Sequence, residues 1–248
     1  MAGSSLQPSG KRVFLHERAG DSGPGPVPQE NMGPTEPTPK EVESTKPIRH
    51  VVLDNFVNPL FLPEIRPVFI DLLGGWESTY FNDCEFNKYS KRLYLPDWAN
   101  EFLERMESLK HVFEGALDEP LYVDHDRWGG GLQAMAPGGY LNTHLDLAQH
   151  PKQPGLRRAF TLILFINDTW ERDWGGELYL TDPLGNPTQV FSVTPGTLVA
   201  FENSDLSYHG VNKVMGPIPR VTLATSFLGK ARPTDTRQRA LFMPKRSK

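Results

Sequence analysis

Two histidines and one aspartate have the types and the spacing needed to hold a redox-active metal ion. His144 and Asp146 stand two apart in the run Gly-Gly-Tyr-Leu-Asn-Thr-His-Leu-Asp, and His209 follows 65 positions after His144. Side chains two apart on a β-strand point to the same face, so His144 and Asp146 can converge on one ion. Two imidazoles and one carboxylate occupy one side of the octahedron around Fe(II) and leave the other side for a cosubstrate and oxygen. These three residues therefore predict a metal centre that oxidises a substrate.

The chain has seven histidines, so a histidine two residues before an aspartate also arises by chance. His125 stands in Asp-His-Asp, which is rich in ligand atoms, but we interpret that run as a surface turn. The histidines outside the predicted centre are interpreted as non-ligands: His16, His50, His111, His125 and His150.

Arg220 adds a fourth element, 11 positions after His209. It opens the run Arg-Val-Thr-Leu-Ala-Thr-Ser-Phe, in which Arg220 and Thr222 share one face of a strand. A buried guanidinium needs an anion, and its planar fork matches a carboxylate. We expect that anion to be the distal carboxylate of 2-oxoglutarate. Taken alone, Arg220 is equally compatible with a core Asp or Glu as its partner.

The elements that must position these residues are mostly strands. Residues 49–57 predict a strand that runs into a segment capped by Asp54 or Asn55. Apolar spacing predicts helices over 64–73 and 98–117, whereas 76–96 show no clear period. Short apolar or alternating runs separated by turn residues predict eight further strands, at residues 131–136, 140–145, 159–166, 177–181, 189–193, 197–201, 209–214 and 220–227.

This order of elements favours a mostly β domain of the α+β class, a jelly roll with an N-terminal helical buttress. A lectin-like or immunoglobulin-like β-sandwich is the alternative on pattern alone, and it would have no use for the metal ligands. Residues 1–47 hold many prolines and are predicted to be a disordered arm. The domain is expected to span 48–232, and residues 233–248 are expected to form a basic C-terminal tail.

The amino-acid composition limits the classes of partner and the cellular location that we expect for this protein. The net charge of −4 offers no general attraction to nucleic acid or to an anionic membrane. The single cysteine, Cys84, excludes an internal disulfide, which favours a reducing, cytoplasmic location. No run approaches the length of a membrane span, and the N-terminus lacks the order of a secretory signal.

Five motifs in a fixed order resemble the 2-oxoglutarate/Fe(II) dioxygenase superfamily, and its prolyl 4-hydroxylase-like branch most of all. The resemblance covers about residues 120–230, and the ordered combination is far more specific than any one motif. The motifs are His144-Leu145-Asp146, Trp174-Gly175-Gly176-Glu177-Leu178, Pro195-Gly196-Thr197-Leu198-Val199-Ala200-Phe201, His209-Gly210-Val211 and Arg220.

The resemblance implies a double-stranded β-helix in which His144, Asp146 and His209 hold Fe(II) and Arg220 anchors 2-oxoglutarate. It further implies O2 as the oxidant and admits ascorbate as an accessory reductant. Decarboxylation of 2-oxoglutarate to succinate would then be coupled to hydroxylation of a C–H bond. Asp146 favours hydroxylation, because halogenating relatives have Gly or Ala at this position.

Some family positions differ in this chain. Phe165 stands where many relatives have a tyrosine, so the hydrogen bond to the distal carboxylate is expected to be absent or to come from Thr222 or Thr161. Met135 stands where some relatives have a cosubstrate-binding tyrosine. Gln133 and Tyr140 are then weaker candidates than Arg220 for binding 2-oxoglutarate.

The expected substrate is a prolyl residue in a peptide or protein, by family appearance only. The alternatives are hydroxylation of a free amino acid or small natural product, dealkylation of nucleic acid, which the acidic balance disfavours, and a jelly roll that only binds a ligand. Loops 124–131, 148–158 and 168–174 are the candidate recognition surface. Trp128, Trp170 and Trp174 either stack on a ligand or pack the barrel edge, and Arg157 and Arg158 either pair with a substrate carboxylate or face solvent.

Overall fold

The computed structural model describes residues 48–65 and 75–243, and within these ranges the chain is mostly antiparallel β structure with few helices. The predicted arm at 1–47 and most of the predicted helix at 64–73 lie outside the described residues.

The predicted strands are confirmed, with shifts of a few residues at their ends. The four strands that carry the predicted site are β5 (Gly131–Leu145), β6 (Leu156–Phe165), β10 (Tyr208–Val211) and β11 (Arg220–Lys230). The others are β1 (His50–Leu53), β2 (Ser78–Phe81), β3 (Glu85–Lys91), β4 (Tyr122–Val123), β7 (Leu178–Thr181), β8 (Pro187–Phe191), β9 (Leu198–Glu202) and β12 (Leu241–Phe242). The segment that showed no period, 76–96, contains the hairpin of β2 and β3.

The two strands predicted at 131–136 and 140–145 are one long strand, β5. The intervening Pro137-Gly138-Gly139 was expected to be a turn, but its backbone pairs with a neighbouring segment: Gly138 N–H donates to Val214 O, and Val214 N–H donates to Gly139 O. With these groups satisfied across the sheet, the chain has no need of a reverse turn here. β5 pairs with β11 before this point and with β10 after it.

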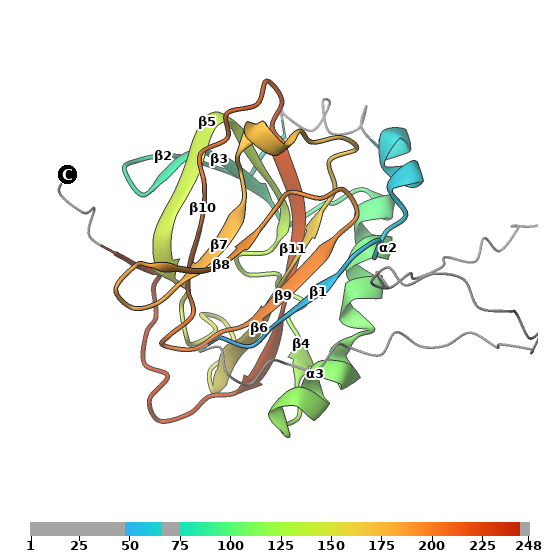
Figure 1. Ribbon diagram of the computed structural model, residues 1–248. Helices are drawn as coiled ribbons and strands as arrows, with labels where there is room; N and C mark the ends of the chain where they lie inside the picture. The colour runs from blue at the N-terminus through green and yellow to red at the C-terminus, as the bar shows by residue number, and fades with distance from the viewer. Residues whose placement is uncertain (1–47, 66–74, 244–248) are drawn as a thin grey trace, which may run out of the picture.

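The main sheet has the strand order β1-β9-β6-β11-β5-β10-β7-β8, and it curls into a half-barrel, as a jelly roll does (Figure 1). β3 and β12 add to β5, β4 adds to β11, and β2 extends β3. β5 and β11 therefore sit in the middle of the curl, with His144 on β5 and Arg220 on β11.

Two helices cover one face of this sheet: α2 (Asp97–Glu107) and α3 (Lys110–Leu117) (Figure 1). They were predicted as a single helix over 98–117, but the chain tightens at the junction, where Leu109 N–H donates to Met106 O and Val112 N–H to Leu109 O. α2 packs against β11. α3 places Phe113 against Phe160 and Phe227, with ring centroids 4.7 Å and 5.4 Å apart.

The cap after β1 is Asn58, not Asp54 or Asn55. The Asn58 side chain accepts the Leu60 N–H at the start of the 3-10 turn η1 (Pro59–Phe61), whereas Asp54 accepts the Thr197 hydroxyl. A second short turn, η2 (Arg172–Trp174), leads into β7. Among the described residues, no helix is long and apolar enough to cross a bilayer.

Part of the segment predicted as a basic C-terminal tail lies against the sheet. β12 pairs with the end of β5 through Leu241 opposite Leu145 and Phe242 opposite His144. The backbone O of Arg237 accepts the N–H groups of Ala148 and Gln149. These contacts bring residues of this segment beside the end of β5.

Candidate metal centre and cosubstrate cavity

Sheet register brings the three predicted metal ligands together. His144 on β5 and His209 on β10 are directly opposite partners, and their ring centroids are 4.3 Å apart. Asp146 follows the end of β5 and places Oδ1 3.5 Å from Nε2 of His144 and Oδ2 3.9 Å from Nε2 of His209. Both histidines are buried, and all three ligand atoms lie within 4.8 Å of one another. The predicted convergence is thus present.

Hydrogen bonds set both ligand histidines in the state that a metal needs. Nδ1 of His144 faces Asn142 O at 3.0 Å, and Nδ1 of His209 faces Ser207 O at 2.8 Å. A carbonyl can only accept, so each Nδ1 carries the proton and each Nε2 is left with its lone pair toward Asp146. Burial, reinforced by the neighbouring His144, lowers the pKa of His209 to about 4, so its ring is neutral at pH 7.

The Asp146 carboxyl is held ionised. Burial alone would raise its pKa, but Arg158 and the two histidines outweigh burial and hold the pKa well below its usual range. Two neutral Nε2 atoms and one carboxylate are the donor set that Fe(II) accepts, so the residues present fit that ion.

A second group of ligand-type residues, Asp124, Asp126 and His150, is arranged differently. Nδ1 of His150 accepts the N–H groups of Lys152 and Gln153, so Nε2 is the protonated nitrogen and donates to Asp124 Oδ1 at 3.1 Å. A nitrogen that donates a hydrogen bond has no lone pair for an ion. This group is a buried hydrogen-bond network, in keeping with the interpretation of His150 as a non-ligand.

Arg220 is buried without an anion. It is 4% exposed, and its Nε and Nη2 atoms are enclosed with no hydrogen-bond partner. Its guanidinium carbon lies 5.1 Å from the centroid of the Phe165 ring. Burial lowers the pKa of Arg220 to about 10, with Glu177 opposing the shift, so the side chain stays charged at pH 7. Among the described residues no Asp or Glu is hydrogen-bonded to either nitrogen, so the alternative of a core acidic partner is reduced to the charge interaction with Glu177.

The two unpartnered nitrogens form one forked edge of the guanidinium, the edge that binds a carboxylate through two parallel hydrogen bonds. Gly176 makes room for this arginine. A Cβ at Gly176 would lie 3.1 Å from Arg220 Cδ and 3.2 Å from the Trp170 ring, and the residue has a φ of +74°. Close packing against Arg220 thus explains the second glycine of the Trp-Gly-Gly motif, whereas a Cβ at the first, Gly175, would overlap the backbone O of Lys213.

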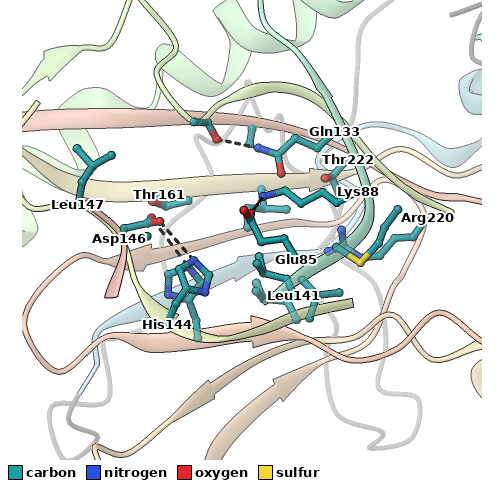
Figure 2. A pocket seen from close by; sticks show the side chains of 18 of the residues that line it. Glu85, Lys88, Gln133, Leu141, His144, Asp146, Leu147, Thr161, Arg220 and Thr222 are labelled. Carbon is teal, nitrogen blue, oxygen red and sulfur yellow. Dashed lines mark hydrogen bonds and ion pairs between the residues drawn. The ribbon is translucent and has the colours of Figure 1, made fainter. Parts of the chain in front are cut away.

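A cavity of about 950 Å³, which includes space open to solvent, joins Arg220 to the metal ligands. Figure 2 shows His144 and Asp146 at one side of it and Arg220 at the other. Thr222 and Gln133 are directly opposite partners on β11 and β5, and both line the cavity. The Gln133 amide donates to Gly129 O at 2.7 Å, which fixes its orientation. A cavity with a set of metal-ligand side chains at one end and the two unpartnered nitrogens of Arg220 at the other suits a short dicarboxylate.

One expected contributor is placed less favourably. Tyr140 is not among the residues that line this cavity, and its ring stacks on Phe86 with the centroids 5.8 Å apart. Thr161 lines the cavity, and its hydroxyl accepts the Asn203 side-chain N–H, which leaves the O–H free to donate. Thr222 and Thr161 both line the cavity and are both candidates to replace the missing tyrosine hydroxyl.

The candidate recognition residues separate into two groups. Trp128 lines the cavity, whereas Trp170 and Trp174 pack edge to face with centroids 5.4 Å apart and lie outside the lining. Neither arginine of the Arg157-Arg158 pair faces solvent. Arg157 pairs with Glu119 away from the cavity, and Arg158 lines the cavity and binds Asp146.

Four cavity residues were not singled out from the sequence in the roles they have here: Glu85, Lys88, Arg158 and Phe242. Glu85 and Lys88 come from β3 and form an ion pair, with Nζ and Oε1 2.6 Å apart (Figure 2). Phe242 stacks on the His144 ring with the centroids 5.1 Å apart. Glu85 and Lys88 gave no signal because their segment shows no period, and Phe242 lies in what was expected to be a tail.

Comparison with known families confirms the resemblance drawn from the motifs. Residues 130–227 match the model of the 2OG-Fe(II) oxygenase superfamily, a range that contains all three predicted metal ligands and Arg220. Fe(II), 2-oxoglutarate and O2 are the cofactors of that family. Among curated proteins, the chain is 28% identical over 212 residues to prolyl 3-hydroxylase OGFOD1 of Mus musculus. The match covers 80% of this chain, which spans 35% of that relative's length.

Solved structures support the fold. A prolyl-4-hydroxylase from Pseudomonas putida superposes with a TM-score of 0.56 at 15% identity, over 74% of this chain and 93% of the other. A prolyl hydroxylase from Trichoplax adhaerens, solved with a hypoxia inducible factor oxygen degradation domain peptide fragment, gives 0.52 at 14% identity, over 73% and 83%. At these identities the likeness concerns the fold, and it agrees with the jelly-roll prediction.

Proposed function

Because residues 130–227 match the model of the 2OG-Fe(II) oxygenase superfamily, we propose that this chain is a 2-oxoglutarate/Fe(II) oxygenase that hydroxylates an unactivated C–H bond of a prolyl residue in a peptide or protein. The scaffold for this reaction is a double-stranded β-helix. The observation that carries the proposal is the pairing of a two-histidine, one-carboxylate centre with an enclosed arginine that lacks an anion, at opposite ends of one cavity.

Each residue has a distinct task in this proposal. His144, Asp146 and His209 hold the ion, and the two backbone carbonyls behind the histidines select the Nδ1–H tautomer, in which Nε2 of the neutral ring carries the lone pair. Arg220 grips the distal carboxylate of 2-oxoglutarate, and Thr222 and Gln133 line its path. When bound, iron and 2-oxoglutarate supply the oxidising power, while the chain sets the position of the substrate and excludes water.

The proposal of a prolyl substrate rests on the similarity of this chain to prolyl hydroxylases and not on a contact seen in its structure. The mouse relative is named for 3-hydroxylation and the bacterial structure for 4-hydroxylation, so the proposal leaves the ring position open. Trp128 at the cavity lining offers an aromatic surface of the kind that packs on a proline ring.

The metal centre is tested first, without turnover. Anaerobic Fe(II) and 2-oxoglutarate should produce a visible metal-to-ligand charge-transfer band that His144→Ala and Asp146→Ala abolish. His50→Ala is the matched control, because His50 also lies in a strand with Nδ1 facing a carbonyl two residues earlier, yet it stands outside the centre. A band that survives Asp146→Ala would refute the ligand assignment.

The substrate is tested next by succinate release with proline-containing peptides, free proline and no substrate. Stimulation by peptides, with a 16-dalton gain that maps to proline on tandem mass spectrometry, is the expected result. Stimulation by free proline alone would instead favour the hydroxylase of a small molecule. Chromatography of the hydrolysed product then distinguishes 3-hydroxyproline from 4-hydroxyproline.

A further inference from the structure

Arg158 on β6 binds the metal ligand Asp146. Its Nη1 donates to Asp146 Oδ2 at 2.7 Å, and its side chain is 6% exposed. The other carboxylate oxygen, Oδ1, faces Nε2 of His144. A charge-assisted bond in a buried site is strong enough to fix the carboxylate, so one of its two oxygens is already committed.

The same guanidinium is anchored to a recognition loop. Nη2 of Arg158 donates to the backbone O of Trp128, and Gly129 lies so close that a Cβ there would be 2.8 Å from Nη2. The loop is held from its other side by Asp124, which accepts the Trp128 N–H at 3.0 Å and is itself bonded to His150. A continuous series of hydrogen bonds therefore runs from His150 through the Trp128 loop to Asp146.

The number of oxygens that Asp146 supplies matters for a centre of this kind. Three protein ligands leave three of six positions, of which 2-oxoglutarate takes two and oxygen needs the last. A carboxylate that bound through both oxygens would remove one of the three. A cation next to a metal ion is also unfavourable in itself, so Arg158 is poorly explained as a residue that strengthens metal binding.

We propose that Arg158 is a positioning residue that holds Asp146 to a single coordinating oxygen and thereby keeps a position open for 2-oxoglutarate. The inference rests on the proposed function, since it assigns a residue to the same metal centre. The hydrogen bond to Trp128 O orients the Arg158 guanidinium toward Asp146, so the orientation of the guanidinium depends on the position of the loop that carries Trp128.

The test measures two affinities separately, with Mn(II) in place of Fe(II) so that no turnover occurs. Mn(II) binding is followed by electron paramagnetic resonance, and 2-oxoglutarate binding to the Mn(II) form by titration calorimetry. Arg158→Met removes the donors but keeps most of the side-chain volume. Arg158→Lys keeps a charge and a donor for Asp146, and Arg157→Met is the matched control, a buried arginine on the same strand that does not line the cavity.

The proposal predicts a split between the two affinities. Arg158→Met should bind Mn(II) as tightly as the parent chain or more tightly, because a cation is lost and a second oxygen is freed, while its affinity for 2-oxoglutarate falls by about tenfold or more. Arg158→Lys should restore 2-oxoglutarate binding to within roughly threefold. Arg157→Met should lower the melting temperature without changing either affinity.

Other outcomes overturn the proposal. Equal losses in both affinities would mean that Arg158 only supports the fold, and no loss of 2-oxoglutarate affinity would mean that Asp146 needs no restraint. Should Arg158→Met fail to fold, Arg158→Gln decides, because it is too short to hold both Asp146 and Trp128 and must show the same split. If the parent chain itself bound neither Mn(II) nor 2-oxoglutarate, the proposed function would fail as well, which distinguishes the two cases.

Discussion

Replacing Arg220 by methionine should make the protein more stable and its cosubstrate affinity worse. Arg220 is buried with two enclosed nitrogens that have no partner. The lowering of its pKa to about 10 by burial corresponds to roughly 3 kcal/mol, at about 1.4 kcal/mol per pH unit. Methionine keeps a stem that packs beside Gly176 and Phe165 and removes the unpaired charge. Unfolding should therefore cost about 1–3 kcal/mol more in the free protein.

The loss on binding follows from the same two nitrogens. A hydrogen bond to a charged group contributes about 1.5–3 kcal/mol, so a forked pair to the distal carboxylate is worth roughly 3–6 kcal/mol. Each 1.4 kcal/mol is a factor of about ten in affinity, so Arg220→Met should weaken 2-oxoglutarate binding by about 100-fold or more. Arg220→Lys keeps the charge but loses the fork, and it should fall between the parent and Arg220→Met.

Thermal melts with and without Mn(II) and 2-oxoglutarate measure both effects in one experiment. For a domain of this size, about 1 kcal/mol shifts the melting temperature by about 2–4 °C, so the free Arg220→Met protein should melt several degrees above the parent. Saturating 2-oxoglutarate should raise the melting temperature of the parent and barely move the variant. A variant that melts below the parent and is still stabilised by 2-oxoglutarate would refute the assignment of Arg220.

Three further predictions concern residues around the cavity and in α2. Lys88→Met should weaken 2-oxoglutarate binding several-fold, because it leaves the Glu85 carboxylate unpaired beside the doubly charged 2-oxoglutarate. The additional change Glu85→Gln should restore this affinity, and a double-mutant cycle measured by calorimetry checks both effects. Burial raises the pKa of Glu107, and the nearby Arg127 only partly opposes this shift. The ionised carboxylate therefore destabilises the folded state at high pH, and the protonated carboxyl does not. Glu107→Gln should raise the melting temperature at pH 8 and should melt like the parent below about pH 4.5. Phe242→Ala removes the ring stacked on His144 and should weaken Mn(II) binding by about two- to tenfold, with 2-oxoglutarate affinity at saturating Mn(II) unchanged.

The convergence of the proposed metal ligands was partly predictable because two physical rules are visible in the sequence. The period of two on a strand places His144 and Asp146 on one face, and the ligand types specify the ion. What the sequence does not show is register. His209 faces His144 because β10 pairs with β5 in one of several possible alignments, and that pairing contains a register shift between His209 and Val211 that spacing does not reveal.

The pair Arg157-Arg158 is predictable in part from strand parity. Consecutive residues on a strand point to opposite faces, so within β6 one of two adjacent arginines must face the inside of the curl. Arg158 lines the cavity and Arg157 does not, so the expectation that both arginines share one role does not hold. The bond of Arg158 to Asp146 in particular depends on tertiary contacts and could not be predicted from spacing.

The difference between His144 and His150 lies in the backbone around each ring rather than in neighbouring residue types. On a strand, Nδ1 of His144 and of His209 meets the carbonyl two residues earlier, which can only accept, so the lone pair is left on Nε2. In the turn after β5, Nδ1 of His150 meets two backbone N–H groups, which can only donate, so Nε2 is protonated and binds Asp124. His50 meets the strand condition but belongs to no group of convergent donors, so the tautomer alone is not sufficient for a metal site. The proposed centre combines two conditions, a carbonyl that accepts the Nδ1 proton and a second donor on the facing strand, and among the described residues the group of His144, Asp146 and His209 meets both.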